Sequence, residues 1–413
     1  MKNIIAIYNK KRSLFADKLT FTRNNRDFSP SELCTSIAII IPASNEYPGI
    51  FNTLDSLAQS IKKNSKQFTV VIVINNSKDA SKAIQQNNKI LYEKILDLNQ
   101  VNDSKKANET FFYSSIYPFK IKVFYLSDSI KKKGVGYARR YGMDWAIASG
   151  AKILACMDAD TLVSKNYATE LIQFKKNSED KSVFALTQFE HQKVDSDLNT
   201  VKLQQSIDAY QSYIKQHSLF LRQTGTPYWP YALGPTIVCT DKAYAEVGGM
   251  PMRSAGEDFY FVQSLVKLSI QQTSSVSAMH ASFNQPTILQ CTVYPASRLS
   301  ERVPFGTGPV LLSVLSGKSI PKVYTSRVYN SIKLLITQIH DNISYIKNGD
   351  LNKVLSILPT EVARFLEKEN FLEVWKKIAK ENEKCPQRLE TAFHIWFDGL
   401  KIIRLIHYLE DMY

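Results

Sequence analysis

The sequence ILACMDAD, residues 153–160, is the stretch from which the rest of the fold can be predicted. Its apolar part is typical of a strand that is buried on both faces of a parallel sheet. The stretch ends in Asp158 and Asp160, which an extended chain would point to the same side. Open α/β sheets bind ligands at the carboxyl ends of their strands, where these two carboxylates would lie. Paired carboxylates suit Mg²⁺ or Mn²⁺, although an Asp-x-Asp taken alone more often caps a helix or lies in a solvated loop.

Three earlier apolar runs look like further buried strands. They are residues 36–42, 68–74 and 121–126. Between the first two runs, apolar residues recur at helical spacing, which predicts a helix there. Another helix is expected between the third run and residue 153. This alternation predicts an α/β fold, a three-layer, Rossmann-like arrangement around a mostly parallel sheet. Residues 78–120 are polar, and we interpret them as an insertion that holds one helix and lies outside the core.

The composition is that of an ordinary soluble globular protein, with 44% hydrophobic and 22% charged residues. A formal net charge of +14 calls for an anionic partner or serves solubility only, and both explanations stay open. The five cysteines are scattered and odd in number, which predicts buried free thiols in a reducing compartment. No apolar run approaches the roughly 18 residues of a membrane-spanning helix, so a cytoplasmic protein is expected, with contact to the inner face of a membrane left open.

The chain is expected to have three parts. Residues 1–35 form a basic, polar N-terminal arm, residues 36–323 form the α/β domain, and residues 324–413 form a helical C-terminal extension. The last helical stretch, residues 389–407, is apolar on more than one side. Such a helix is buried in its own chain, forms a dimer or lies on a membrane.

Five short motifs follow one another along about residues 36–310. They are Pro42-Ala43-x-Asn45-Glu46, Asn75-Asn76-Ser77, the glycine-containing segment Gly134–Gly142, Asp158-Ala159-Asp160 and Gly256-Glu257-Asp258. Their order resembles that of family-2 nucleotide-sugar glycosyltransferases of the GT-A fold. The later segment Ser300–Gly308 resembles that of a bacterial subgroup of these enzymes whose acceptors are poorly defined. One departure concerns Asn75-Asn76, where many members carry Asp-Asp to receive the base and ribose. This departure leaves the identity of the base open.

The resemblance implies a metal-dependent, inverting, hexosyltransferase-like enzyme that moves a sugar from a nucleoside-diphosphate donor to an acceptor hydroxyl. Asp158 and Asp160 would hold the divalent cation, Mn²⁺ or Mg²⁺, and Asp258 would be the catalytic base, with Glu257 positioning the acceptor. The residues expected to bind the nucleotide are Pro42, Ala43, Asn45, Glu46, Asn75, Asn76, Lys133, Gly136, Arg139 and Asp158. The donor would be UDP- or GDP-linked, and the acceptor is an unknown glycan, lipid-linked molecule or small molecule.

Cations gather at two other places in the sequence. Lys131 to Lys133, with Arg139 and Arg140, surround a glycine-containing helix start, which suits a diphosphate but is also typical of a solvated basic loop. Arg302 lies in a segment with two glycines and a proline, which suits a mobile loop that closes over the diphosphate and stabilises the leaving group. A plain surface turn is the alternative for that segment.

Other candidates have simpler explanations. Asp258 could be a helix cap instead of a base. A lone histidine such as His191 or His280 is more often a satisfied core or surface residue than a metal ligand. The aromatic segment Tyr228–Tyr231 could stack on a sugar or form a packed corner.

Two other functions are considered. A sugar-1-phosphate nucleotidyltransferase should carry a glycine-rich signature after its first strand, where this chain has residues 43–46, ASNE. A non-catalytic module that binds a nucleotide-sugar or nucleic acid would suit the basic charge but would not require both acidic motifs. Nucleic acid is therefore the disfavoured partner, and salt-dependent retention on it would revive that alternative.

Overall fold

The computed structural model describes most of the chain. It covers residues 3–15, 34–62, 65–98, 109–126, 134–193, 200–273, 285–298, 307–316, 323–343, 351–383, 385 and 388–413. Contacts divide the chain into two units. The first consists of Met1–Asp208, Ala232–Leu265 and Pro286–Ser319, and the second of Ala209–Tyr231, Val266–Gln285 and Ile320–Tyr413. The expected boundary at residue 323 stays a prediction, and the second unit takes segments from both sides of it.

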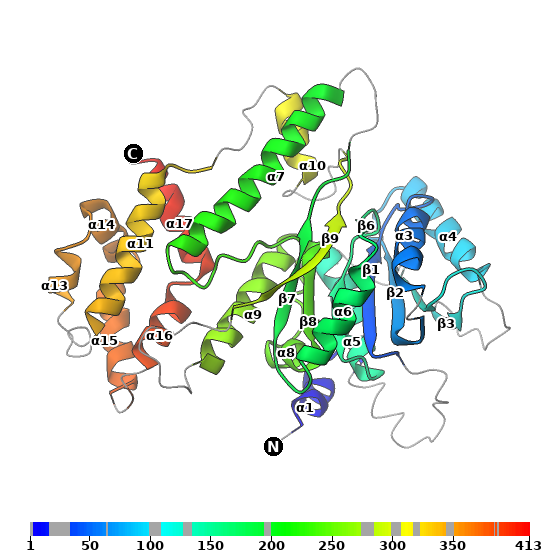
Figure 1. The fold of residues 1–413 in the computed structure, drawn as a ribbon, viewed down its shortest axis with the longest axis horizontal. Coiled ribbons are helices and arrows are strands. Elements are labelled where there is room, and N and C mark those ends of the chain that lie inside the picture. Colours follow the sequence, from blue (N-terminus) through cyan, green and yellow to red (C-terminus); the bar gives the residue numbers. More distant parts are fainter. Residues whose placement is uncertain are drawn as a thin grey trace. The chain divides into compact units, whose positions relative to one another are not determined.

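The first unit is built around one nine-stranded sheet (Figure 1). Its strands are β1 (Ile37–Ala43), β2 (Phe68–Asn75), β3 (Glu109–Tyr113), β4 (Lys120–Leu126), β5 (Ile153–Cys156), β6 (Leu162–Val163), β7 (Phe184–Phe189), β8 (Ile237–Thr240) and β9 (Thr287–Tyr294). Their order is β3-β4-β2-β1-β5-β8-β7-β9-β6. Six strands run in one direction, and only β3, β8 and β6 run against them. The predicted mostly parallel sheet is confirmed.

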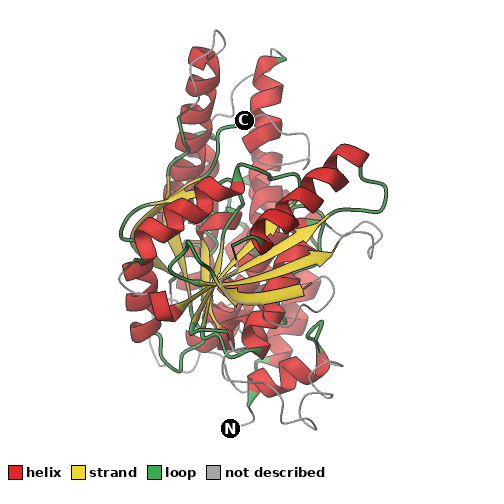
Figure 2. Cartoon of the chain, turned by 90° about the vertical axis from the view of Figure 1, so that its right-hand side faces the viewer, coloured by secondary structure: helices red, strands yellow, loops and turns green. Residues whose placement is uncertain are grey.

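Helices cover both faces of this sheet (Figure 2). One face carries α3 (Ile50–Ile61), α4 (Lys82–Leu96) and α6 (Tyr167–Asn177), and the other carries α5 (Val135–Ala148) and α8 (Asp241–Glu246). Helix α1 (Ile4–Lys11) packs on α5 and α8. Short 3₁₀ turns precede β2 and β8 at Ser65–Gln67 and Gly234–Thr236, and α10 (Thr307–Leu315) is the last helix of the unit. Every residue of β2, and all but Pro42 of β1, is buried, because helices cover both faces. The three-layer, Rossmann-like α/β class is therefore confirmed.

The N-terminal segment differs from the expected polar arm. Tyr8, on α1, is buried and donates a hydrogen bond from its hydroxyl to Asp144 on α5, at 2.6 Å. The backbone N–H of Leu14 donates to the other oxygen of the same carboxylate, at 2.8 Å. Because Asp144 is itself fully buried, these donors replace the water that it would otherwise need. Helix α1 thus belongs to the first unit.

The segment expected to be an insertion is also part of this unit. Helix α4 packs against β2 and β4, and its side chains Asn88, Leu91 and Ile95 are buried. Strand β3, which the sequence did not reveal, pairs antiparallel with β4 at the edge of the sheet. The polar composition misled the interpretation because only one face of α4 needs apolar residues.

The second unit is helical in all its described parts, as expected for the C-terminal region. It contains α11 (Ser326–Asp341), α13 (Asn352–Leu355), α14 (Thr360–Lys368), α15 (Phe371–Glu381), α16 (Arg388–Trp396), α17 (Gly399–Glu410) and parts of α7 (Thr200–Gln223) and α9 (Glu257–Thr273). Buried aromatic rings of α15 and α16, among them Trp375 and Phe393, form its core. The structure describes no helix long and apolar enough to cross a membrane.

The apolar stretch at the C-terminus is two helices and not one. Asp398 interrupts it and accepts a hydrogen bond from the backbone N–H of Lys401 as the cap of α17. The face of α17 that carries Ile402, Leu405 and Leu409 is buried, so packing within the chain accounts for it.

All five cysteines are free, and four of them are buried, as predicted. In the aromatic segment, Tyr228 and Trp229 are buried, and the Tyr228 hydroxyl donates to the carbonyl of His394 at 2.8 Å. That segment is a packed corner.

Candidate active site at the carboxyl ends of β1 and β5

The acidic stretch lies where the order of the strands reverses. From β1 the chain moves through α3 to β2 on one side, whereas β5, reached through α5, pairs with β1 on the other side. Such a switch point leaves a crevice at the carboxyl ends of the two strands, which is where open α/β sheets bind ligands. Asn45 and Glu46 follow β1 at this point, and Asp158 and Asp160 follow β5.

Hydrogen bonds hold the loop of the two aspartates in place. The Thr53 hydroxyl, buried on α3, donates to the carbonyl of Ala159 at 2.9 Å. The side-chain amide of Gln192 donates to the carbonyl of Asp160 at 2.8 Å, and the N–H of Met157 donates to the carbonyl of Ile40 at 3.0 Å. The loop is therefore fixed from a helix, a neighbouring strand and a distant segment, as a preorganised site requires.

Arg139 joins the two acidic motifs. Its guanidinium group contacts Asp158 through one nitrogen and Glu257 through another, and its side chain is 3% exposed. Gly234 makes this approach possible, because a side chain there would collide with the guanidinium. Burial acts to lower the pKa of Arg139, but the negative charges of Asp158 and Glu257 outweigh it and raise that pKa. Arg139 is thus a permanent cation between the motifs.

A second arginine, Arg298, which sequence reasoning missed, joins the carboxylates of Glu46 and Asp160. One nitrogen of Arg298 lies 2.7 and 2.9 Å from the two oxygens of Glu46 and 2.7 Å from Asp160. The sequence had pointed to Arg302, which lies outside the described residues. No local pattern distinguishes Arg298, because its partners lie far away in the chain. Its side chain is 40% exposed, in contrast to that of Arg139.

Asp258 lies in the first turn of α9, beside Glu257. One of its oxygens accepts a hydrogen bond from the N–H of Phe259 at 2.8 Å, and the residue is partly exposed. Desolvation by the surrounding protein and the charge of Glu257 raise its pKa to about 6, although Arg139 and the Phe259 N–H act in the opposite direction. A carboxylate with such a pKa can accept a proton near neutral pH.

Amide side chains gather at the end of β2. Asn75 and Asn76 are buried there, and Asn88 on α4 donates to the side-chain oxygen of Asn76 at 2.9 Å. Asn88 also accepts from the N–H of Asn45 at 2.8 Å, and Asn45 has a left-handed backbone with φ 61°. Asn88 escaped sequence analysis because it lies in the segment taken for an insertion. The side-chain amide of Asn76 also donates to the carbonyl of Ser77 at 3.0 Å, so a base would have to share or replace these bonds.

The diphosphate site expected at the start of α5 stays a prediction, and the described part of this segment has contacts of its own. The N–H of Gly136 donates to the carbonyl of Arg253 at 3.2 Å, and a Cβ at position 136 would lie 2.5 Å from the carbonyl oxygen of Pro251. The glycine therefore makes room for the loop before the second acidic motif, and its N–H is already used. Arg140 does not accompany Arg139, because it forms an ion pair with Asp144 at 3.5 Å. Residues Lys131 to Lys133 and His280 lie outside the described residues.

The described carboxylates outnumber the cations. Glu46, Asp158, Asp160, Glu257 and Asp258 face Arg139 and Arg298, so five carboxylates and two guanidinium groups leave a net charge of −3 when all are ionised. Such a group repels a bare diphosphate. The hard oxygens of Asp158 and Asp160 fit Mg²⁺ or Mn²⁺, which take one or two carboxylates and complete their shell with water and substrate phosphates. The chemistry of the donors thus fits a divalent cation.

Comparison with known proteins adds little to this geometry. No protein-family model and no curated protein matches the chain. Among solved structures, S. aureus TarS 1-349 in complex with UDP-GlcNAc is similar with a TM-score of 0.40 and 12% identity, over 87% of this chain and 91% of that one. The mannosyltransferase PcManGT from Pyrobaculum calidifontis, in complex with GDP-Man and Mn²⁺, is similar with a TM-score of 0.34 and 14% identity, over 95% and 97% of the two chains. Similarity at these TM-scores gives no information about the function of this chain.

Proposed function

We propose that this protein is a metal-dependent, inverting glycosyltransferase that moves a hexosyl group from a nucleoside-diphosphate sugar to an acceptor hydroxyl. The observation that carries the proposal is the pair of contacts that Arg139 makes with Asp158 and Glu257. These contacts bring two acidic motifs, of which one suits a metal and the other a proton acceptor, to one switch point of the sheet. A module that only binds would need the first motif and not the second.

The excess of negative charge supports a nucleoside diphosphate that binds together with a cation. Asp158 and Asp160 are the residues that would hold Mn²⁺ or Mg²⁺. When bound, this cation neutralises charge that develops on the leaving diphosphate. Asn45, Glu46 and the buried amides at the end of β2 are proposed to receive the base and ribose, since amide groups can both donate and accept hydrogen bonds.

Asp258 is the proposed base. In its ionised form it takes the proton of the acceptor hydroxyl while the acceptor oxygen forms a bond to the anomeric carbon. The bond from that carbon to the diphosphate oxygen breaks in the same step, and the nucleoside diphosphate leaves with the electron pair. Attack from the side opposite to the leaving group inverts the anomeric centre. Glu257 is held by Arg139 beside Asp258, where it positions the acceptor and keeps the pKa of the base high.

The proposal is tested by calorimetric titration of UDP and GDP, each with and without Mn²⁺. We expect the wild type to bind one of them only when Mn²⁺ is present, and Asp158→Ala/Asp160→Ala to lose this binding. A matched control is Glu93→Ala/Asp97→Ala, which removes two exposed carboxylates of the first unit. Binding that is indifferent to Mn²⁺ would remove the two aspartates from the mechanism. The absence of binding to either nucleotide would contradict the donor class.

A further inference from the structure

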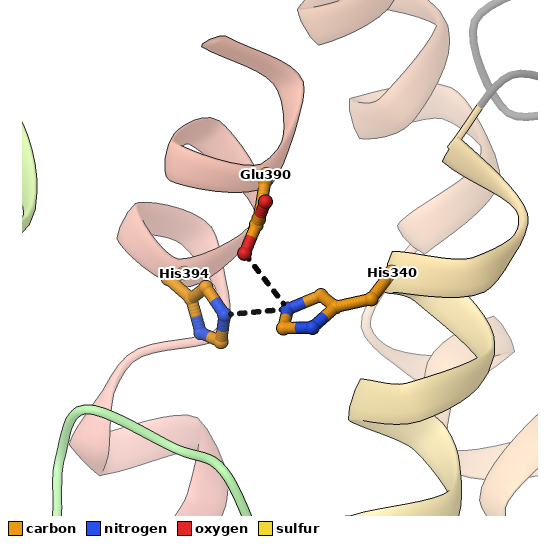
Figure 3. A group of neighbouring side chains, drawn as sticks. All are labelled: His340, Glu390 and His394. Atoms are coloured by element: carbon orange, nitrogen blue, oxygen red, sulfur yellow. Dashed lines mark hydrogen bonds and ion pairs between the residues drawn. The ribbon is translucent and has the colours of Figure 1, made fainter. Parts of the chain in front are cut away.

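A second group of side chains that could bind a metal lies in the second unit. None of these side chains takes part in the proposed reaction. It consists of His340 at the end of α11 and of Glu390 and His394 on α16 (Figure 3). One ligand atom from each residue lies within 4.8 Å of the other two. Among the residues that the structure describes, no other three histidine, cysteine or acidic side chains converge in this way.

The sequence of α16 explains two of the three positions. Glu390 and His394 are four residues apart, which puts both side chains on one face of the helix. Glu390 lies in the first turn of α16, where the helix dipole favours an acidic side chain. His340 lies in the last turn of α11, where the dipole favours a basic one. The carboxylate and the two imidazole rings therefore meet between the two helices (Figure 3).

The spacing of the ligand atoms fits a bound cation. The Nε2 atoms of His340 and His394 are 3.2 Å apart, and Nε2 of His340 lies 3.3 Å from an oxygen of Glu390. Zinc binds nitrogen and oxygen at about 2.0–2.2 Å, so two ligands of a tetrahedral zinc are separated by about 3.3–3.6 Å. These two separations lie close to that range, and the third, between His394 and Glu390, is at most 4.8 Å, so small side-chain movements would bring all three ligand atoms around one cation.

Hydrogen bonding alone satisfies this arrangement poorly. Nε2 of His340 is the atom shared by both contacts, and it carries at most one hydrogen. If it donates to Glu390, it cannot also make a good bond to His394. If it accepts from His394, its lone pair lies near a carboxylate oxygen. A cation between the three residues would remove this conflict.

We propose that His340, Glu390 and His394 form a zinc site that ties α11 to α16. His394 is fully buried, where an uncharged imidazole is favoured, and the uncharged ring is the form that binds metal. The side chains of His340 and Glu390 are 25% and 23% exposed, so water can reach the cation as a fourth ligand. The cation stabilises the folded form of the second unit, because the unfolded chain does not hold the three ligands together.

The test uses the full chain after treatment with EDTA and removal of the chelator. To keep the first unit's acidic site out of the measurement, all variants are made in the Asp158→Ala/Asp160→Ala background. Zinc is added, unbound metal is removed, and bound metal is measured by mass spectrometry together with the thermal unfolding midpoint. We expect about one zinc per chain and a midpoint that rises with zinc.

His340→Ala and Glu390→Gln should each weaken zinc binding by at least about tenfold. Changing a residue that only supports a metal ligand already weakens metal binding by about tenfold or more, and a change of the ligand itself should do no less. They should also abolish the rise of the midpoint with zinc. Glu390→Gln keeps the size of the side chain, so it remains informative if His340→Ala folds poorly. His407→Ala, which removes an exposed histidine of the same unit, should leave both readouts unchanged. Zinc binding that survives Glu390→Gln, or a chain that takes up no zinc, would overturn the proposal and leave a hydrogen-bonded network in its place.

Discussion

Replacement of Glu257 by glutamine is expected to move the acid limb of the activity to lower pH. Asp258 must be ionised to accept a proton, and its pKa in the folded protein is raised from 3.8 to about 6. Burial is the first cause of this rise, and the charge of Glu257 is the second. Glutamine keeps an acceptor oxygen for Arg139 but carries no charge. The pKa of Asp258 should therefore fall, and the base should stay ionised at a lower pH.

The size of the shift follows from the same causes. Burial is the larger of the two main causes, so the variant should lose only the part of the rise above 3.8 that the charge of Glu257 produces. We expect the pKa of Asp258 to fall by about one, which corresponds to about 1.4 kcal/mol. Arg139, relieved of one of its two anionic partners, acts in the same direction because it favours the ionised form of Asp258.

The assay is the pH dependence of kcat/KM for cleavage of a nucleotide-sugar that carries the nucleotide identified by titration, with water or an acceptor as the second substrate. A carbon-detected NMR titration of protein labelled at aspartate follows the same carboxylate without substrate. Glu93→Gln is the matched control, because Glu93 is an exposed carboxylate of the same unit. An acid limb that stays in place, or moves to higher pH, would refute the assignment of Asp258 as the base whose pKa Glu257 controls.

Two further substitutions test the framework of the site. Thr53→Val should leave the carbonyl of Ala159 without its donor and lower the free energy of unfolding by about 1–3 kcal/mol. It should also weaken Mn²⁺-dependent nucleotide binding in calorimetry. Ser60→Ala, on the same helix, is the control and should not affect that binding. Tyr8→Phe removes a donor to a fully buried carboxylate and should cost about 1.5–3 kcal/mol in chemical denaturation. A smaller loss than for Tyr117→Phe, whose carboxylate partner is less buried, would contradict this account of the N-terminal helix.

Much of the central sheet could be predicted because its strands are buried on both faces. Strands β1, β2 and β5 need continuous apolar runs, and a polar residue after such a run marks the carboxyl end of the strand. The positions of Asp158 and Asp160 follow from this rule without knowledge of the rest of the chain. Helix α4 was misjudged for the opposite reason, since a helix at the edge of a layer can be mostly polar and still belong to the core.

The partners of the site's cations could not be predicted. Arg139 and Glu257 are 118 residues apart, and Arg298 and Glu46 are 252 residues apart, so neither pair leaves a local pattern. Two neighbouring arginines in the sequence, Arg139 and Arg140, are directed to different carboxylates because successive residues of a helix point in different directions. Only the folded sheet decides which of them reaches the acidic motifs.

The two arginines of the site differ in a way that bears on how a cation would enter. Arg139 is 3% exposed and held from two sides, so its loss from Asp158 would leave a buried charge poorly compensated. Arg298 is 40% exposed and Asp160 is 25% exposed, so their contact can be exchanged for water at less cost than the contacts of Arg139. A divalent cation that binds Asp160 is therefore expected to displace Arg298 and not Arg139. Arg298, once released, keeps its charge at the mouth of the site, where the phosphates of the donor would arrive with the cation.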